Sequence, residues 1–212
     1  MRKKTLLTLV TIAALATSGN AAVLALFGFD TYDGTSPVSP ESGTQSGTAT
    51  LTTASGPGGT TFSAQVGNPT LALGVGNGLA ANGSTFTILV NGTGFTDFMV
   101  SYDVKKGGVD SFAWQWSTDG STFATIQFAS PGTGSGFNST TINFSGVTAI
   151  NNAPAVYLRN SMTGATGQNG RTDFDNIQVS AVPEPINVAL ALFGLAFVGL
   201  RFGRRVLSFV CK

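Results

Sequence analysis

The sequence predicts an all-β protein, an antiparallel β-sandwich flanked by one helix at each end of the chain. Three observations predict it. Short runs of β-branched and aromatic residues recur along the middle of the chain, with turn residues between them. Several of these runs alternate apolar and polar residues, which buries one face of a strand and exposes the other. Glycine is abundant, at 28 of 212 residues, and no helical period occurs between the two ends.

The N-terminal end, residues 1–22, has the layout of a secretory signal peptide. Positive residues 2–4 precede an apolar core at 6–16 and small residues at 17–22, which is the pattern that export machinery reads. The apolar core is shorter than the roughly 20 residues that span a bilayer. We therefore expect export by the Sec machinery and cleavage of this helix, rather than a retained anchor.

The exported part opens with predicted strands and loops. Residues 23–29 form an apolar run that predicts a buried strand, and the turn-rich residues 31–47 predict a surface loop. Residues 48–54 alternate small or apolar side chains with threonine, as an edge strand does. The glycine-rich residues 55–83 predict no element.

The clearest strands follow this glycine-rich stretch. β-Branched and aromatic residues predict a strand at 84–91, and alternation predicts strands at 96–105, 109–117 and 122–129. The Asp119-Gly120 pair between the last two is the strongest short-range signal for a hairpin. Further strands are predicted at 140–144, 155–159 and 172–180. An exported domain of about 160 residues (23–181) is long enough to bury a core without disulfides.

Composition excludes several functions. Between Val23 and Val182 the chain carries nine acidic and four basic residues, a net charge of −5, which gives no basic footprint for nucleic acid. The one cysteine, Cys211, lies near the C-terminus, and the chain has no histidine. Histidine is the commonest general base and metal ligand. Without it, and with acids scattered mostly beside turns, we predict a non-catalytic protein with no cofactor.

The C-terminal end has three parts with separate physical roles. Two prolines keep a four-residue motif extended, an uncharged run of fifteen residues can cross a bilayer as a helix, and arginines hold its cytoplasmic end. The motif is Val182, Pro183, Glu184 and Pro185, the transmembrane helix is 186–200, and the basic stop is Arg201, Arg204 and Arg205 in a tail that runs to residue 212.

This ending resembles the PEP-CTERM sorting signal of exported proteins from Gram-negative bacteria that make extracellular polysaccharide. The resemblance implies that an exosortase-type enzyme of the inner membrane recognises the motif and processes the chain near it. It also implies a transient membrane anchor, followed by release to the cell surface or extracellular matrix. The tail departs from the family by continuing for seven residues after Arg205. The alternative interpretation is an ordinary C-terminal membrane anchor.

A second resemblance concerns the predicted sandwich. The run Trp114-x-Trp116-Ser-Thr-Asp-Gly-Ser-x-Phe123, together with residues 156–159 and 173–179, resembles jelly-roll sandwiches of secreted bacterial proteins. Those modules are mostly carbohydrate-binding or adhesive. The resemblance implies a jelly-roll-like fold and an alternative function, a lectin-like carbohydrate-binding module that Ca²⁺ could assist.

Two sets of residues are candidates for such a module. Trp114, Trp116 and Tyr102 could stack on sugar rings, although their alternation with apolar neighbours favours core packing. Asp173 and Asp175 lie two apart, so they share a face of a strand and could help to hold Ca²⁺. Alternatively, they bond to backbone amides at the loop before that strand. Exposed tryptophans and converging carboxylates would favour the lectin-like function.

Three basic residues also have two interpretations. Lys105, Lys106 and Arg159 could contact acidic polysaccharide, or they could be simply solvated, as isolated cations at strand ends usually are. The leading prediction is a non-catalytic exported protein, sorted by an exosortase-type system to the cell surface or polysaccharide matrix. Carbohydrate binding is the alternative.

Overall fold

The computed structural model describes residues 20–59, 62–76, 78–132, 134–166, 171–184 and 193–194. Residues Asn20–Pro183 form one unit, built from strands and two short 3-10 turns, Gly78–Ala81 and Thr148–Ile150. The strands are β1 (Ala22–Phe27), β2 (Thr50–Ala54), β3 (Phe62–Val66), β4 (Leu71–Val75), β5 (Thr85–Val90), β6 (Phe95–Lys105), β7 (Phe112–Ser117), β8 (Ala124–Ala129), β9 (Phe137–Asn143), β10 (Val156–Met162) and β11 (Thr172–Pro183).

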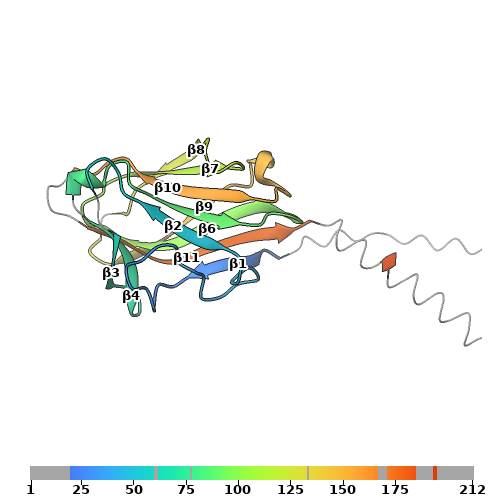
Figure 1. Cartoon of the computed structure of the whole chain (residues 1–212), viewed down its shortest axis with the longest axis horizontal. Coiled ribbons are helices and arrows are strands. Elements are labelled where there is room, and N and C mark those ends of the chain that lie inside the picture. Colours follow the sequence, from blue (N-terminus) through green and yellow to red (C-terminus); the bar gives the residue numbers. More distant parts are fainter. Residues whose placement is uncertain are drawn as a thin grey trace, which may run out of the picture. The chain divides into compact units, whose positions relative to one another are not determined.

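The strands form two antiparallel sheets packed face to face. One sheet has the order β3-β4-β11-β6-β9, with β1 also paired to β11, and the other has the order β2-β5-β10-β7-β8. Figure 1 shows them as two layers, with β7, β8 and β10 in one and β1 and β11 in the other. The predicted antiparallel sandwich is confirmed. The chain passes repeatedly from one sheet to the other, which is consistent with a jelly-roll-like topology.

Strand β11 organises the six-stranded sheet. Its first residues pair with β4 and its residues from Ile177 to Ala181 pair with β1, so these two strands follow one another along the same edge. Its other edge pairs with β6 almost throughout. The strand is mostly buried, although half of its residues are polar, because neighbouring strands cover both of its edges and the core covers one face.

The core fills the space between the sheets with rings from both. Phe86 of β5 meets Trp114 of β7 edge to face, with ring centroids 5.6 Å apart. It meets Phe174 of β11 in the same way, at 5.1 Å. All three side chains are fully buried, and burial of a side chain of this size stabilises a fold by about 1.5–3 kcal/mol. The alternation read in the sequence is the alternation between this core and solvent.

The structure differs from the predicted elements in one region. The hairpin β3–β4 lies within residues 55–83, for which no element was predicted. The outer limits of the sandwich are also slightly wider than 23–181, because β1 begins at Ala22 and β11 ends at Pro183.

The two predicted helices lie almost entirely outside the described residues. This holds for the signal peptide up to residue 19, for Pro185, for nearly all of the 186–200 helix and for Arg201, Arg204 and Arg205. In the parts of the chain that are described, no helix has the length and apolar character needed to cross a membrane.

Candidate functional site

The aromatic residues chosen from the sequence are core residues. Trp114 and Tyr102 are 0% and 2% exposed, and the indole Nε1 of Trp114 donates a hydrogen bond of 3.2 Å to the Tyr102 hydroxyl. Burial raises the pKa of Tyr102 to about 12. Trp116 lies opposite Leu158 on the inward side of the sheet and packs, partly buried, against the core. The proposed sugar contacts at Trp114 and Tyr102 are therefore wrong, because neither ring offers a face to a ligand.

The predicted carboxylates Asp173 and Asp175 are buried and engaged with protein donors. Arg171 donates two hydrogen bonds to Asp173, of 2.5 and 3.2 Å. Asp175 accepts the backbone N–H groups of Asn68, at 2.6 Å, and Asn176, at 2.7 Å. Among the described residues no three acidic or cysteine side chains are placed to hold a metal ion. The bonds of Asp175 therefore match the alternative to a Ca²⁺ site, in which the carboxylate accepts hydrogen bonds from backbone amides.

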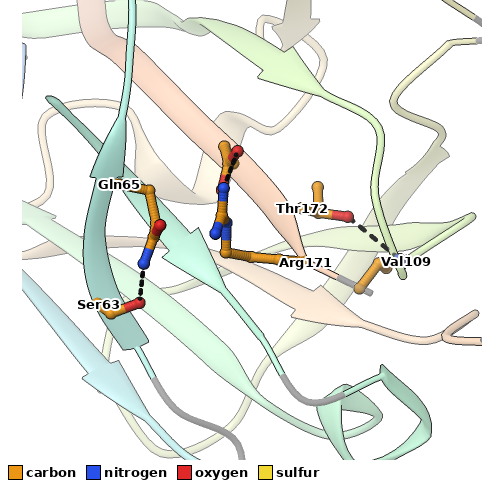
Figure 2. Close-up of polar contacts among 6 residues, drawn as sticks. Ser63, Gln65, Val109, Arg171 and Thr172 are labelled. Atoms are coloured by element: carbon orange, nitrogen blue, oxygen red, sulfur yellow. Dashed lines mark hydrogen bonds and ion pairs between the residues drawn. The ribbon is translucent and has the colours of Figure 1, made fainter. Parts of the chain in front are cut away.

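Figure 2 shows the surroundings of Arg171 at the start of β11. The Thr172 hydroxyl accepts the backbone N–H of Val109 at 3.1 Å. On β3, which is separated from β11 by β4, Gln65 donates to the Ser63 hydroxyl at 2.8 Å. The polar side chains around the start of β11 therefore bond to other protein groups, which is typical of a structural role.

A different surface, the outer face of the five-stranded sheet, brings polar and aromatic side chains together. Strand pairing places Arg159 of β10 opposite Gln115 of β7, with Tyr157 two residues along on the same face. On the edge strand β8, Phe128 lies opposite Ala113 and points away from the core. We call this set the outer strip, which consists of Gln115, Phe123, Thr125, Phe128, Tyr157 and Arg159.

Three contacts between side chains from neighbouring segments hold the centre of the outer strip. The guanidinium carbon of Arg159 lies over the Phe123 ring, 3.5 Å from its centroid. Its Nε donates to the Gln115 side-chain oxygen at 2.8 Å, and the Gln115 amide donates to the Thr125 hydroxyl at 3.2 Å. Each contact restrains the next, so the centre of the strip is held in place by the protein's own contacts, and a preorganised site loses less entropy on binding.

The hairpin between β7 and β8 supports this arrangement. The Asp119 carboxylate accepts the Ser117 hydroxyl at 2.8 Å and two backbone N–H groups that follow it, and these bonds hold its pKa well below the usual range. Gly120 has a φ of 71°, and a Cβ there would lie 2.9 Å from the Tyr157 ring. The hairpin therefore folds over the outer face beside Tyr157, with the Asp-Gly turn that the sequence predicted.

The outer strip combines the groups that sugars need. Phe128 is 68% exposed, and Tyr157 and Phe123 are half-buried. Exposed rings can stack on the apolar faces of sugars, and amide, hydroxyl and guanidinium groups can bond to their oxygens. The sequence predicted a strand at 155–159 and named Arg159 as a possible contact for acidic polysaccharide, but it did not identify Phe128 or Tyr157 as candidates, because the tryptophans were the more obvious aromatic candidates.

The comparisons with known proteins are weak. No protein family matches the chain, and no curated protein matches it. Among solved structures, TmCBM61 in complex with β-1,4-galactotriose is 11% identical, with 72% of this chain and 92% of that chain covered and a TM-score of 0.44.

Two further structures are similar at the same level. A CBM29-2 variant complexed with mannohexaose is 12% identical, with 79% of this chain and 96% of that chain covered and a TM-score of 0.47. The K3 adhesin domain of Lys-gingipain from Porphyromonas gingivalis w83 is 11% identical, with 76% and 99% covered and a TM-score of 0.47. The fold is established by the strand pairing above, and these likenesses add no argument to it.

Proposed function

We propose that the sandwich is a non-catalytic module that binds carbohydrate through the outer strip. The observation that carries the proposal is the exposed ring of Phe128 on the same sheet face as the half-buried rings of Tyr157 and Phe123, with hydroxyl, amide and guanidinium groups between the two ends. Ligand sites combine apolar contact area with a few placed polar groups. A sugar presents the complementary surface, with C–H groups on its face and hydroxyls at its edge.

Other exposed apolar side chains of the sandwich do not form a comparable surface. Val66, 74% exposed, lies on β3 of the opposite sheet, and Leu79, 51% exposed, lies in a 3-10 turn. Both are aliphatic, and scattered single exposures of this kind are normal. Phe128 differs because it is aromatic and shares its sheet face with polar side chains that hydrogen-bond to one another, Gln115, Thr125 and Arg159.

Alanine substitution in the strip tests the proposal. Phe128→Ala and Tyr157→Ala should each weaken binding to a soluble polysaccharide about tenfold, the equivalent of about 1.4 kcal/mol. Calorimetric titration over a panel of polysaccharides measures the affinities. Val66→Ala is the matched control, because it removes an exposed apolar side chain from the other sheet and should leave affinity unchanged. Strip variants that bind as tightly as the wild type would exclude this surface as the site.

This form of carbohydrate binding replaces the one built on Trp114, Tyr102 and Ca²⁺. It needs no metal, and its aromatic groups come from the sheet exterior rather than the core. A chain without histidine can bind a sugar in this way, since stacking and hydrogen bonding require no titrating group.

We further propose that the protein is exported, sorted through its C-terminal signal and released to the cell surface or polysaccharide matrix. One structural observation supports this. Strand β11 ends at Pro183, which lies opposite Phe95 of β6, and Glu184 follows the last strand. The sandwich therefore ends within the sorting motif, so processing beside the motif would leave the folded body intact.

Mass spectrometry of the protein recovered from its native cell envelope tests the sorting proposal. We expect an N-terminus created after Ala21 or Ala22 and a C-terminus near Pro185. A population that keeps Cys211 and stays in the membrane, in cells that possess the processing enzyme, would overturn it. Either result leaves the carbohydrate-binding test unaffected.

A further inference from the structure

Arg159 is the one charged side chain among the outward-facing positions of the five strands β2, β5, β10, β7 and β8, all of which the structure describes. No described carboxylate pairs with it. The other described arginine, Arg171, has a carboxylate partner in Asp173, and Lys106 pairs with Asp110 at 2.8 Å. The cation of the outer strip thus lacks the counter-charge that Arg171 and Lys106 have.

The geometry leaves one edge of this guanidinium available. The Phe123 ring lies against the guanidinium carbon, and Gln115 accepts the hydrogen bond from Nε, so the two terminal nitrogens are the donors left. Partial burial lowers the pKa of Arg159, because desolvation disfavours the charged form. A half-buried cation without an anion is unfavourable unless a partner supplies one.

We propose that Arg159 binds the carboxylate of a uronic acid residue, so that the ligand of the outer strip is an acidic polysaccharide. The inference rests on the proposed carbohydrate-binding function and names the class of its ligand. The planar guanidinium matches a carboxylate with two parallel hydrogen bonds, which an ammonium cannot reproduce. Phe128 supplies a ring for a neighbouring sugar at one end of the outer strip, and Tyr157 lies at the opposite end, with Arg159 between them.

The charge of the whole domain makes this contact specific. Residues 23–182 carry a net charge of −5, so the long-range electrostatic field of the domain repels a polyanion. Non-specific attraction is therefore not a rival explanation for binding to an acidic polysaccharide. Binding has to come from a local contact, and on this face that contact is Arg159.

Matched polysaccharide pairs separate the acidic ligand from a neutral one. The probes are polygalacturonate and its methyl ester, and alginate and its propylene glycol ester, in which the carboxylate is blocked on the same backbone. Calorimetric titration should show at least one acidic member bound about tenfold more tightly than its ester. Arg159→Gln should remove that preference, and Arg159→Lys should restore only part of it. Lys105→Gln, which removes one positive charge from the other sheet, is the control and should keep the preference.

The outcomes distinguish the inference from the function on which it rests. Equal affinity for acid and ester, with Arg159→Gln as tight as the wild type, overturns the acidic ligand and leaves carbohydrate binding standing. Binding to no polysaccharide overturns both. The wild-type comparison of acid and ester needs no substitution, so it decides the matter even if Arg159→Gln unfolds.

Discussion

Asp175 makes the stability of the sandwich depend on pH in the direction opposite to that of most carboxylates. Its side chain is fully buried in β11, and it lies opposite Asp103 of β6. Burial raises its pKa to about 6, from an ordinary value of 3.8, although the N–H groups of Asn68 and Asn176 oppose the shift. The neighbouring charges of Asp103 and Asp30 add to it.

The sign of the effect follows from proton binding. In the pH range between the two values the folded chain holds a proton on Asp175 that the unfolded chain releases. The stabilisation is complete below pH 4 and is lost as the pH rises through about 6. A shift of about two units corresponds to a fall of up to about 3 kcal/mol in the free energy of unfolding.

Other shifted carboxylates act in a separate window. Hydrogen bonds lower the pKa values of Asp33, Asp110 and Asp119, so the stability that these groups contribute is lost only as the pH falls below about 4. Between pH 4.5 and 7.5, Asp175 is therefore the shifted carboxylate that titrates, and we expect the free energy of unfolding to decline across that range.

Urea unfolding at several pH values between 4.5 and 7.5 measures this decline. Asp175→Asn should flatten the profile, because the amide does not titrate. Asp97→Asn is the control: the acid is exposed on β6, and its φ of 53° suits asparagine as well as aspartate. That variant should keep the wild-type slope. A wild-type profile that is level or rises with pH, or a fall that persists in Asp175→Asn, would refute the assignment.

Three further substitutions test the packing. Tyr102→Phe leaves the buried N–H of Trp114 without its acceptor and should lower the free energy of unfolding by about 1–3 kcal/mol in urea; no change would mean that the bond contributes nothing. Phe174→Ala should cost about 3–5 kcal/mol, and a loss below 1 kcal/mol would contradict its central place in the core. Gly67→Ala would place a Cβ 2.0 Å from the Leu71 carbonyl oxygen, so calorimetry should show a lower melting temperature, whereas an unchanged one would show that the turn can relax.

The sandwich could be predicted because alternation is a local property of the sequence. In β6 the buried residues Phe98, Val100, Tyr102 and Val104 alternate with more exposed ones, and the same pattern in β5 and β10 reports one face packed on a core. The Asp119-Gly120 turn was equally readable, because a positive φ in a hairpin favours glycine.

The hairpin β3–β4 could not be predicted for the opposite reason. Ser63, Ala64 and Gln65 have little intrinsic preference for a strand, and β3 is only half-buried along its length. What holds this hairpin is its pairing to β11, since Phe174 lies opposite Leu73. That contact joins residues about a hundred positions apart in the sequence, so the local pattern of residues within 55–83 could not predict it.

The outer strip shows why the sequence picks the wrong aromatic residues for a surface site. A large ring that could serve as a sugar platform also gains the most from burial, and Trp114 lies between two sheets that can cover it. Phe128 is on β8, the edge strand of its sheet, with its side chain on the outer face, where no second sheet lies opposite. Its exposure is therefore set by the position of its strand and not by its residue type. A strand's place in the sheet is a non-local property, so the ring that remains available to a ligand becomes identifiable only when the pairing of all five strands is known.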